Sequence, residues 1–216
     1  MNGPIKNQKS KLSNGFTIVE LLLATAVFSI VLLGALSAFL RTGNLFYKGV
    51  SLTQTQSINK QIVDDVSTTI INTSASKVSP LQTSGGYNYY CVGNIRYTFN
   101  SPSKPLDLSS AQDLSAGGNY GVIRDTISGC SAPCVSSCPA PFNKPTEMLA
   151  DRMRVSNFTI TPSVSGKLFT INLTIAYGDD SAMINPASSS PTCNDSSHNQ
   201  QFCSVSTLST SVFAEF

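Results

Sequence analysis

The N-terminal part of the chain changes abruptly from polar to apolar. Residues 1–15 include Lys6, Lys9 and Lys11 and no acid, whereas residues 16–40 form an almost unbroken apolar run. A helix of this length reaches about 38 Å, which exceeds the roughly 30 Å hydrocarbon core of a bilayer. The pattern therefore predicts a helix that spans a membrane.

This anchor is expected to stay on the protein, with its N-terminus in the cytoplasm. A secretory signal has a small-residue cleavage site after its apolar region, and no good site of this kind follows residue 40. The lysines precede the run and only Arg41 directly follows it, a charge distribution that favours a cytoplasmic N-terminus. We expect a single-pass membrane protein whose C-terminal domain lies outside the cytoplasm.

The helical pattern continues beyond the apolar run to about residue 72. Apolar side chains recur there mostly at spacings of three or four, with polar ones between them; they are Leu45, Phe46, Val50, Leu52, Ile58, Ile62, Val66 and Ile70. Such spacing predicts an amphipathic helix that continues the anchor. Its apolar side is expected to pack on the globular domain that follows.

Short segments with β character follow a breaker that is rich in Ser and Thr and ends at Pro80. They are residues 87–92, 95–99, 120–126, 154–161, 167–177 and 204–213. Apolar and more polar residues alternate from Phe169 to Tyr177, which indicates a strand with one buried face. Residues 101–119, 129–145 and 178–201 are rich in turn formers and are predicted to be long surface loops.

These patterns predict an α+β fold. A long N-terminal helix, transmembrane in its first half, would pack on a small antiparallel β-sheet domain with disulfide-pinned loops. The expected organisation is a leader at residues 1–15, a transmembrane helix at 16–41, its amphipathic continuation at 42–72 and a β-rich extracytoplasmic domain at 73–216.

Composition argues against several classes of function. Only 12% of the residues are charged and the formal net charge is +2, so the sustained positive field typical of nucleic-acid binding is missing. The chain has no Trp and a single histidine, His198, which leaves few catalytic groups. We therefore expect no enzyme activity, no cofactor, and neither a nucleic acid nor a small molecule as substrate.

One acidic residue, Glu20, interrupts the apolar run. An ionisable group at the centre of a bilayer costs roughly 2.5–3.5 kcal/mol, so its presence requires a reason. Glu20 lies four residues after Phe16. Cleavage after Gly15 would create a free amine about one helical turn from this carboxylate, and the cut itself would supply a partner for the charge.

The sequence GFTIVEL at residues 15–21 resembles the processing motif of type IV pilins and of the pseudopilins of type II secretion. The match covers about residues 9–45. It implies that Gly15 is the last leader residue, that Phe16 is the new and methylated N-terminus, and that Glu20 neutralises the amine of a neighbouring subunit. It also implies processing by a prepilin peptidase. Many major pilins carry a proline within this helix, but none occurs between Phe16 and Lys60 here.

The six cysteines all lie in the C-terminal two thirds of the chain. An even number in an exported chain indicates disulfides. Three of them are spaced four residues apart, which is not the usual C-x2-C spacing of a metal site, so we expect no metal. Sequence alone leaves many pairings open, and the preferred pairs are Cys193 with Cys203, Cys91 with Cys130, and Cys134 with Cys138.

Other candidate chemistry has a simpler interpretation. Asp179 and Asp180 could bind calcium, but a solvated turn after the strand fits them better. A single histidine, His198, is expected to be an exposed loop residue. The tyrosines at 87, 89, 90 and 97 could stack on a ligand, but half-buried strand positions account for them.

A structural role in a type IV pilus or related filament fits these features best. The domain is larger and richer in loops than a compact major subunit needs, which favours a minor pilin over a major pilin or a secretion pseudopilin. A membrane-tethered binding module that never polymerises is the alternative from another class. The expected partners are the prepilin peptidase, other pilin subunits and, before assembly, the inner membrane; after assembly the chain would lie in a filament at the cell surface.

Overall fold

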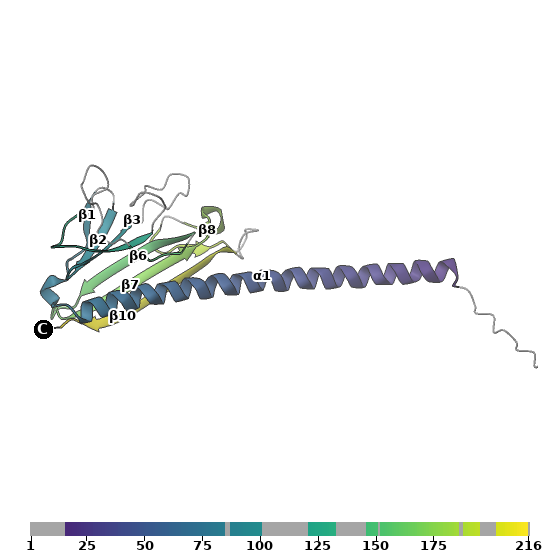
Figure 1. The fold of residues 1–216 in the computed structure, drawn as a ribbon. Coiled ribbons are helices and arrows are strands. Elements are labelled where there is room, and N and C mark those ends of the chain that lie inside the picture. Colours follow the sequence, from purple (N-terminus) through teal and green to yellow (C-terminus); the bar gives the residue numbers. More distant parts are fainter. Residues whose placement is uncertain are drawn as a thin grey trace, which may run out of the picture. The chain divides into compact units, whose positions relative to one another are not determined.

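The structure is a computed structural model that describes residues 16–84, 87–100, 121–132, 146–150, 152–185, 188–194 and 202–215 (Figure 1). Its contacts divide the chain into two units, Met1–Asn44 and Leu45–Phe216. The first contains the N-terminal part of a long helix, and the second contains the remainder of that helix together with the sheets. The fold is α+β, as the sequence predicts.

Helix α1 extends from Ile18 to Ile71 and comprises 54 residues. No proline interrupts it, and its three glycines have open space around them, so nothing forces a break. The helix ends where the amide of Thr73 bonds the carbonyl of Ile70 in a tighter turn (3.0 Å). A short 3-10 helix, η1 (Ala75–Lys77), follows.

The strands after η1 form an antiparallel five-stranded sheet in the order β1-β2-β3-β4-β5. Their bounds are β1 (Gln82–Ser84), β2 (Tyr87–Val92), β3 (Ile95–Asn100), β4 (Val122–Thr126) and β5 (Thr146–Glu147). Consecutive strands are neighbours, so this sheet is a simple meander. The turn between β2 and β3 contains Gly93 in the left-handed region, at φ 60°.

A second antiparallel sheet contains the three longest strands, in the order β10-β7-β6. They are β6 (Met153–Pro162), β7 (Leu168–Tyr177) and β10 (Ser204–Phe213). The register shifts between Val155 and Asn157, which marks a β-bulge in β6. The C-terminal part of α1 lies along this sheet (Figure 1).

One hydrophobic core joins α1 to both large sheets. Its helix residues, Ile62, Val63, Val66 and Ile70, are buried against side chains of β2, β3, β4, β6 and β7. Tyr90 of β2 links the sheets directly, because its hydroxyl accepts the amide of Ile160 at 3.2 Å. This bond connects β2 to β6, which is an edge strand of the other sheet.

The structure corrects one prediction about the β region. The small antiparallel β-sheet domain that the sequence predicts is present, and its described residues form three sheets. The predicted loop at residues 178–201 contains a 3-10 helix, η2 (Asp180–Ala182), and a third sheet of β8 (Met183–Ile184) and β9 (Thr192–Cys193). Strands of two residues are too short to show periodicity, so the pattern of the sequence did not reveal them.

A polar seam joins α1 to β10, and it differs from the predicted apolar contact. Ser51, Thr55 and Asn59 are the buried helix residues nearest the start of the domain. The hydroxyls of Thr55 and Ser204 lie 2.6 Å apart. The Asn59 amide donates to the carbonyl of Ser206 at 2.9 Å and to that of Leu173 at 3.3 Å.

The apolar residues predicted to make this contact are instead exposed. Leu45, Phe46, Val50 and Leu52 lie on other sides of the helix. The helix turns by about 100° per residue, so the face that meets the sheet is set by the positions 51, 55 and 59. Farther along, Ile62, Val66 and Ile70 are buried as predicted.

A second polar contact holds the C-terminal end of α1 against β3 and β4. One carboxylate oxygen of Asp65 accepts the Tyr97 hydroxyl at 2.7 Å and the Arg124 guanidinium at 3.0 Å. Burial raises the pKa of the Tyr97 hydroxyl well above its ordinary value of 10.0. Tyr97 therefore remains a neutral hydrogen-bond donor across physiological pH.

Glu147 in β5 is a carboxyl group in an unusual position. Its Oε1 atom accepts the amides of Val122 at 3.1 Å and Leu149 at 2.8 Å, and its Oε2 atom is buried without a hydrogen-bond partner. Burial raises the pKa of Glu147 from 4.5 to about 7, although the backbone donors oppose this shift. The side chain ties β5 to the start of β4.

The polar seam predicts a measurable loss of stability for Asn59→Ala. The substitution leaves buried acceptors without their donor, which typically costs about 1–3 kcal/mol. Urea denaturation of the detergent-solubilised chain should show this lower free energy of unfolding. Gln56→Ala, on an exposed position of the same helix, is the matched control and should change stability by less than about 0.5 kcal/mol. Equal effects of the two substitutions would contradict the seam.

The buried carboxyl group of Glu147 predicts that stability falls as pH rises. The unfolded chain releases this proton near pH 4.5 and the folded chain near pH 7, so the contribution is fully present below 4.5 and is lost as pH rises to about 7. The free energy of unfolding should drop by roughly 1–3 kcal/mol between about pH 5 and pH 8. Glu147→Gln should abolish most of this drop, and Asp64→Asn, at an exposed helix position, should preserve it. The same pH dependence in Glu147→Gln would exclude this carboxyl as its source.

Candidate assembly site

The N-terminal motif forms the start of α1. Gly15 lies outside the described residues, and Phe16 and Thr17 precede the helix with Phe16 exposed. The backbone carbonyl of Thr17 accepts the amides of Glu20 and Leu21, both at 3.1 Å. Its side-chain hydroxyl also accepts the amide of Glu20 at 3.3 Å. Thr17 therefore caps the helix by satisfying donors of its first turn.

Glu20 is the acidic residue of this first turn, and its side chain is exposed. A carboxylate near a helix N-terminus is stabilised by the helix dipole. Thr17 and Glu20 have the T-x-x-E spacing of a capping box. The charge of Glu20 within an apolar run makes this residue conspicuous in the sequence. Thr17 was not predicted, although the T-x-x-E spacing could have identified it.

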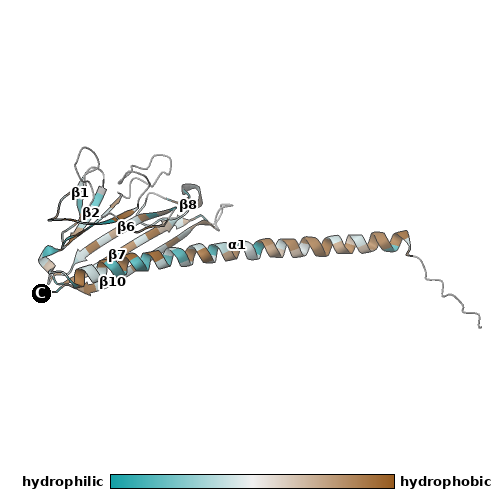
Figure 2. Ribbon diagram, in the orientation of Figure 1, coloured by the Kyte–Doolittle hydropathy of each residue, from teal (hydrophilic) through white to brown (hydrophobic). Residues whose placement is uncertain are grey.

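The part of α1 that follows Glu20 is apolar on all sides. Figure 2 shows hydrophobic colour along this part of the helix, and polar colour becomes frequent only nearer the C-terminal end of α1. Of the helices in the described residues, α1 is long and apolar enough to cross a membrane, and none of its most apolar stretch is buried. Large side chains such as Leu23, Phe28 and Phe39 are exposed. These side chains therefore require an apolar environment, either lipid or another protein, that lies outside the chain.

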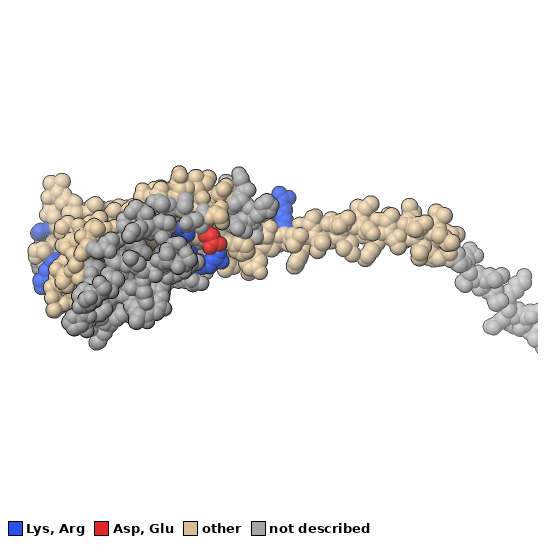
Figure 3. Space-filling view, turned by 90° about the horizontal axis from the view of Figure 1, so that it is seen from above, with Lys and Arg blue, Asp and Glu red and all other residues tan. Residues whose placement is uncertain are grey.

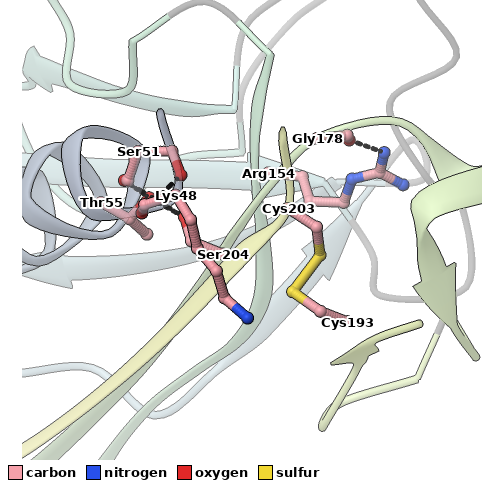
Figure 4. The surroundings of a disulfide bond; sticks show 8 residues. All are labelled: Lys48, Ser51, Thr55, Arg154, Gly178, Cys193, Cys203 and Ser204. Atoms are coloured by element: carbon pink, nitrogen blue, oxygen red, sulfur yellow. Dashed lines mark hydrogen bonds between the residues drawn. A yellow bond between two sulfur atoms is a disulfide. The ribbon is translucent and has the colours of Figure 1, made fainter. Parts of the chain in front are cut away.

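The Cys193–Cys203 disulfide links β9 to the residue that precedes β10 (Figure 4). The Arg154 guanidinium nearby donates to the carbonyl of Gly178 at 2.8 Å. Gly178 has φ 119°, and a Cβ atom there would approach the Phe202 carbonyl to 2.5 Å. The bridge and the glycine together fix the position at which the chain re-enters the sheet.

The Cys91–Cys130 disulfide is present as well, beside a buried ion pair. The guanidinium of Arg96 contacts the Asp125 carboxylate through two nitrogens, at 3.0 and 2.6 Å. It also donates to the carbonyl of Ser131 at 2.8 Å. Covalent and charged contacts thus hold the segment after β4 to β2 and β3. Both pairings match the first two predicted from the sequence, whereas Cys134 and Cys138 lie outside the described residues.

The remaining candidates from the sequence have structural surroundings where they are described. Tyr89, Tyr90 and Tyr97 are buried strand residues, as the simpler interpretation predicted. Asp179 accepts a hydrogen bond from Arg152 at 2.7 Å. His198 lies outside the described residues. The site that carries functional information is therefore the N-terminal motif and the helix it begins.

Comparison with known proteins identifies this same region. A family model described as the prokaryotic N-terminal methylation motif matches residues 10–36. No curated protein and no solved structure matches the chain. The matched segment contains Gly15, Phe16, Thr17 and Glu20 and the first part of the apolar helix. The chain therefore carries the type IV prepilin-like signature at its N-terminus.

Proposed function

We propose that the chain is a structural subunit of a type IV pilus or related filament, and specifically a minor pilin. One observation carries this proposal: the methylation motif at residues 10–36 begins a helix whose apolar half is exposed in the folded chain. That half requires a bilayer before assembly and neighbouring helices afterwards. The motif points to a structural subunit rather than an enzyme.

The proposed maturation removes residues 1–15. A prepilin peptidase would cut after Gly15, at the cytoplasmic boundary between the polar leader and the apolar run, and Phe16 would become the methylated N-terminus. The basic leader and the single Arg41 after the run support a cytoplasmic N-terminus and an extracytoplasmic domain. Residues 16–41 would then be the anchor, residues 42–72 its continuation and residues 73–216 the globular domain.

The proposed assembly contact pairs Glu20 with the amine of a neighbouring subunit. Glu20 lies in the first turn of α1 and is exposed in the single chain, so it is available to a partner. In the apolar core of a filament an unpaired amine or carboxylate would be strongly unfavourable. Such a pair would therefore fix how far one subunit lies from the next along the filament.

Two other assignments compete with the minor pilin. A type II secretion pseudopilin would share the motif and the helix. Co-purification with either a named pilus or a named secretion system distinguishes a minor pilin from a pseudopilin. A tethered binding module would use the helix only as an anchor and would stay in the membrane fraction. The size of the domain and its disulfide-linked segments support a subunit with an interactive surface.

The proposed maturation predicts that the mature protein begins at Phe16. Mass spectrometry of the N-terminal peptide from the wild-type strain should show Phe16 first, with a methylated amine. In a strain that lacks the prepilin peptidase, the same peptide should retain the leader from Met1. An intact leader in wild-type filaments would contradict the processing.

The proposed assembly contact predicts how Glu20→Ala behaves. Membrane insertion should persist, because the substitution makes the run more apolar. Incorporation into filaments should fall at least severalfold, since an uncompensated buried charge costs about 3–5 kcal/mol.

Immunoblots of membranes and of sheared filaments measure both quantities. Thr25→Ala, also on the apolar half of α1, is the control and should assemble normally. Wild-type amounts of Glu20→Ala in filaments would remove Glu20 from the assembly mechanism.

A further inference from the structure

Three consecutive large side chains of α1 are exposed where the globular unit begins. Leu45, Phe46 and Tyr47 are 67%, 66% and 57% exposed. Successive residues of a helix point about 100° apart, so these three side chains point in three different directions. We call Leu45, Phe46 and Tyr47 the collar. A partner helix packs along one face, whereas a collar of this kind matches a layer that surrounds the helix.

Phe202 adds a fourth large apolar side chain from a distant part of the sequence. Its ring centroid lies 6.1 Å from that of Tyr47, and 37% of the residue is exposed. It directly precedes Cys203, which is buried and bonded to Cys193. The adjacent disulfide and the close approach of the Phe202 backbone carbonyl to Gly178 thus restrict the backbone at Phe202, whose ring lies beside Tyr47.

Two features of the described residues bear on the charge near the collar. Lys48 follows it directly, and no acidic residue occurs between Glu20 and Asp64. Asp179, which follows Gly178, is paired with Arg152 at 2.7 Å. Much of the described surface visible in Figure 3 is uncharged. An anionic layer would therefore meet a positive charge at Lys48 and no unpaired carboxylate at Asp179.

The position of the collar in the sequence places it close to the end of the apolar run. Phe46 is six residues beyond Leu40, which is about 9 Å in a helix and at most about 20 Å in any conformation. The headgroup region on each side of a bilayer is roughly 5–8 Å thick. Aromatic side chains are enriched at this depth because their amphipathic rings suit the boundary between lipid and water.

We propose that the collar and Phe202 form a seat on the outer surface of the bilayer, in contact with anionic phospholipid headgroups. This inference rests on the proposed membrane anchoring. Lys48 would extend to the phosphates, and the rings would lie at the level of the glycerol groups. The Cys193–Cys203 bridge then has a specific role, because it holds Phe202 at the membrane until the subunit enters a filament.

The absence of Trp from the chain permits a direct test. Three full-length variants each carry one reporter: Phe202→Trp in the seat, Phe28→Trp in the apolar run, and Phe213→Trp at the opposite end of β10. Strand β10 has ten residues, so its ends are about 30 Å apart. Each variant is reconstituted in vesicles of phosphatidylethanolamine and phosphatidylglycerol whose acyl chains are brominated near the headgroup or near the terminal methyl.

The seat predicts that Phe202→Trp emission shifts to shorter wavelength and loses intensity with bromine near the headgroup, while Phe213→Trp emission does not. Adding Lys48→Glu to Phe202→Trp should weaken the quenching, and replacing phosphatidylglycerol with phosphatidylcholine should do the same.

Unquenched Phe202→Trp together with quenched Phe28→Trp would overturn the seat but preserve the anchor. Unquenched Phe28→Trp would instead overturn the anchor. A shift of Phe202→Trp that depends on protein concentration and not on bromine would assign this surface to a second copy of the chain.

Discussion

The organisation of this protein depends on one constraint: the apolar half of α1 cannot be satisfied by its own chain. Burying a single Leu, Ile or Phe side chain contributes about 1.5–3 kcal/mol, and residues 18–40 expose many of them. A bilayer and a bundle of neighbouring helices both meet this need. The same side chains can therefore serve an anchored subunit and an assembled one, and in the assembly that we propose Glu20 would distinguish the two environments.

The globular unit uses a different kind of contact to hold the other half of the helix. Near the start of the domain the contact consists of Ser51, Thr55 and Asn59 against β10, and only later does it become an apolar core. Hydrogen bonds have strict geometry, so this seam fixes the rotation and the position of α1 on the sheet.

The sequence predicted the long elements of the fold because their periodicity is strong. Helix α1 and the strands β2, β3, β4, β6, β7 and β10 match predicted segments to within a few residues. The seam was missed because Ser51, Thr55 and Asn59 are polar and resemble the solvent side of an amphipathic helix. Glu147 was missed because its carboxyl group is held by the backbone amides of Val122 and Leu149. The hydrophobic pattern of the sequence does not show which backbone amides lie near a given side chain.

The candidate site shows a similar division between local and tertiary signals. Gly15, Phe16 and Glu20 stand out because a motif and an unexpected charge occur together over a few residues. Two of the preferred disulfide pairs, Cys91–Cys130 and Cys193–Cys203, are present in the structure. The second pair could be predicted because its cysteines bracket a segment between predicted strands. The contact of Phe202 with Tyr47 joins residues far apart in the chain, and no local pattern predicts it.

Pulse-labelling of the cells, followed by separation of membranes from sheared extracellular filaments at successive times, shows whether the membrane-anchored chain is the precursor of a filament subunit. We expect label to appear first in the membrane fraction and then to move into filaments as the chain that begins at Phe16. Label that stays in the membrane while filaments form without it would contradict this role.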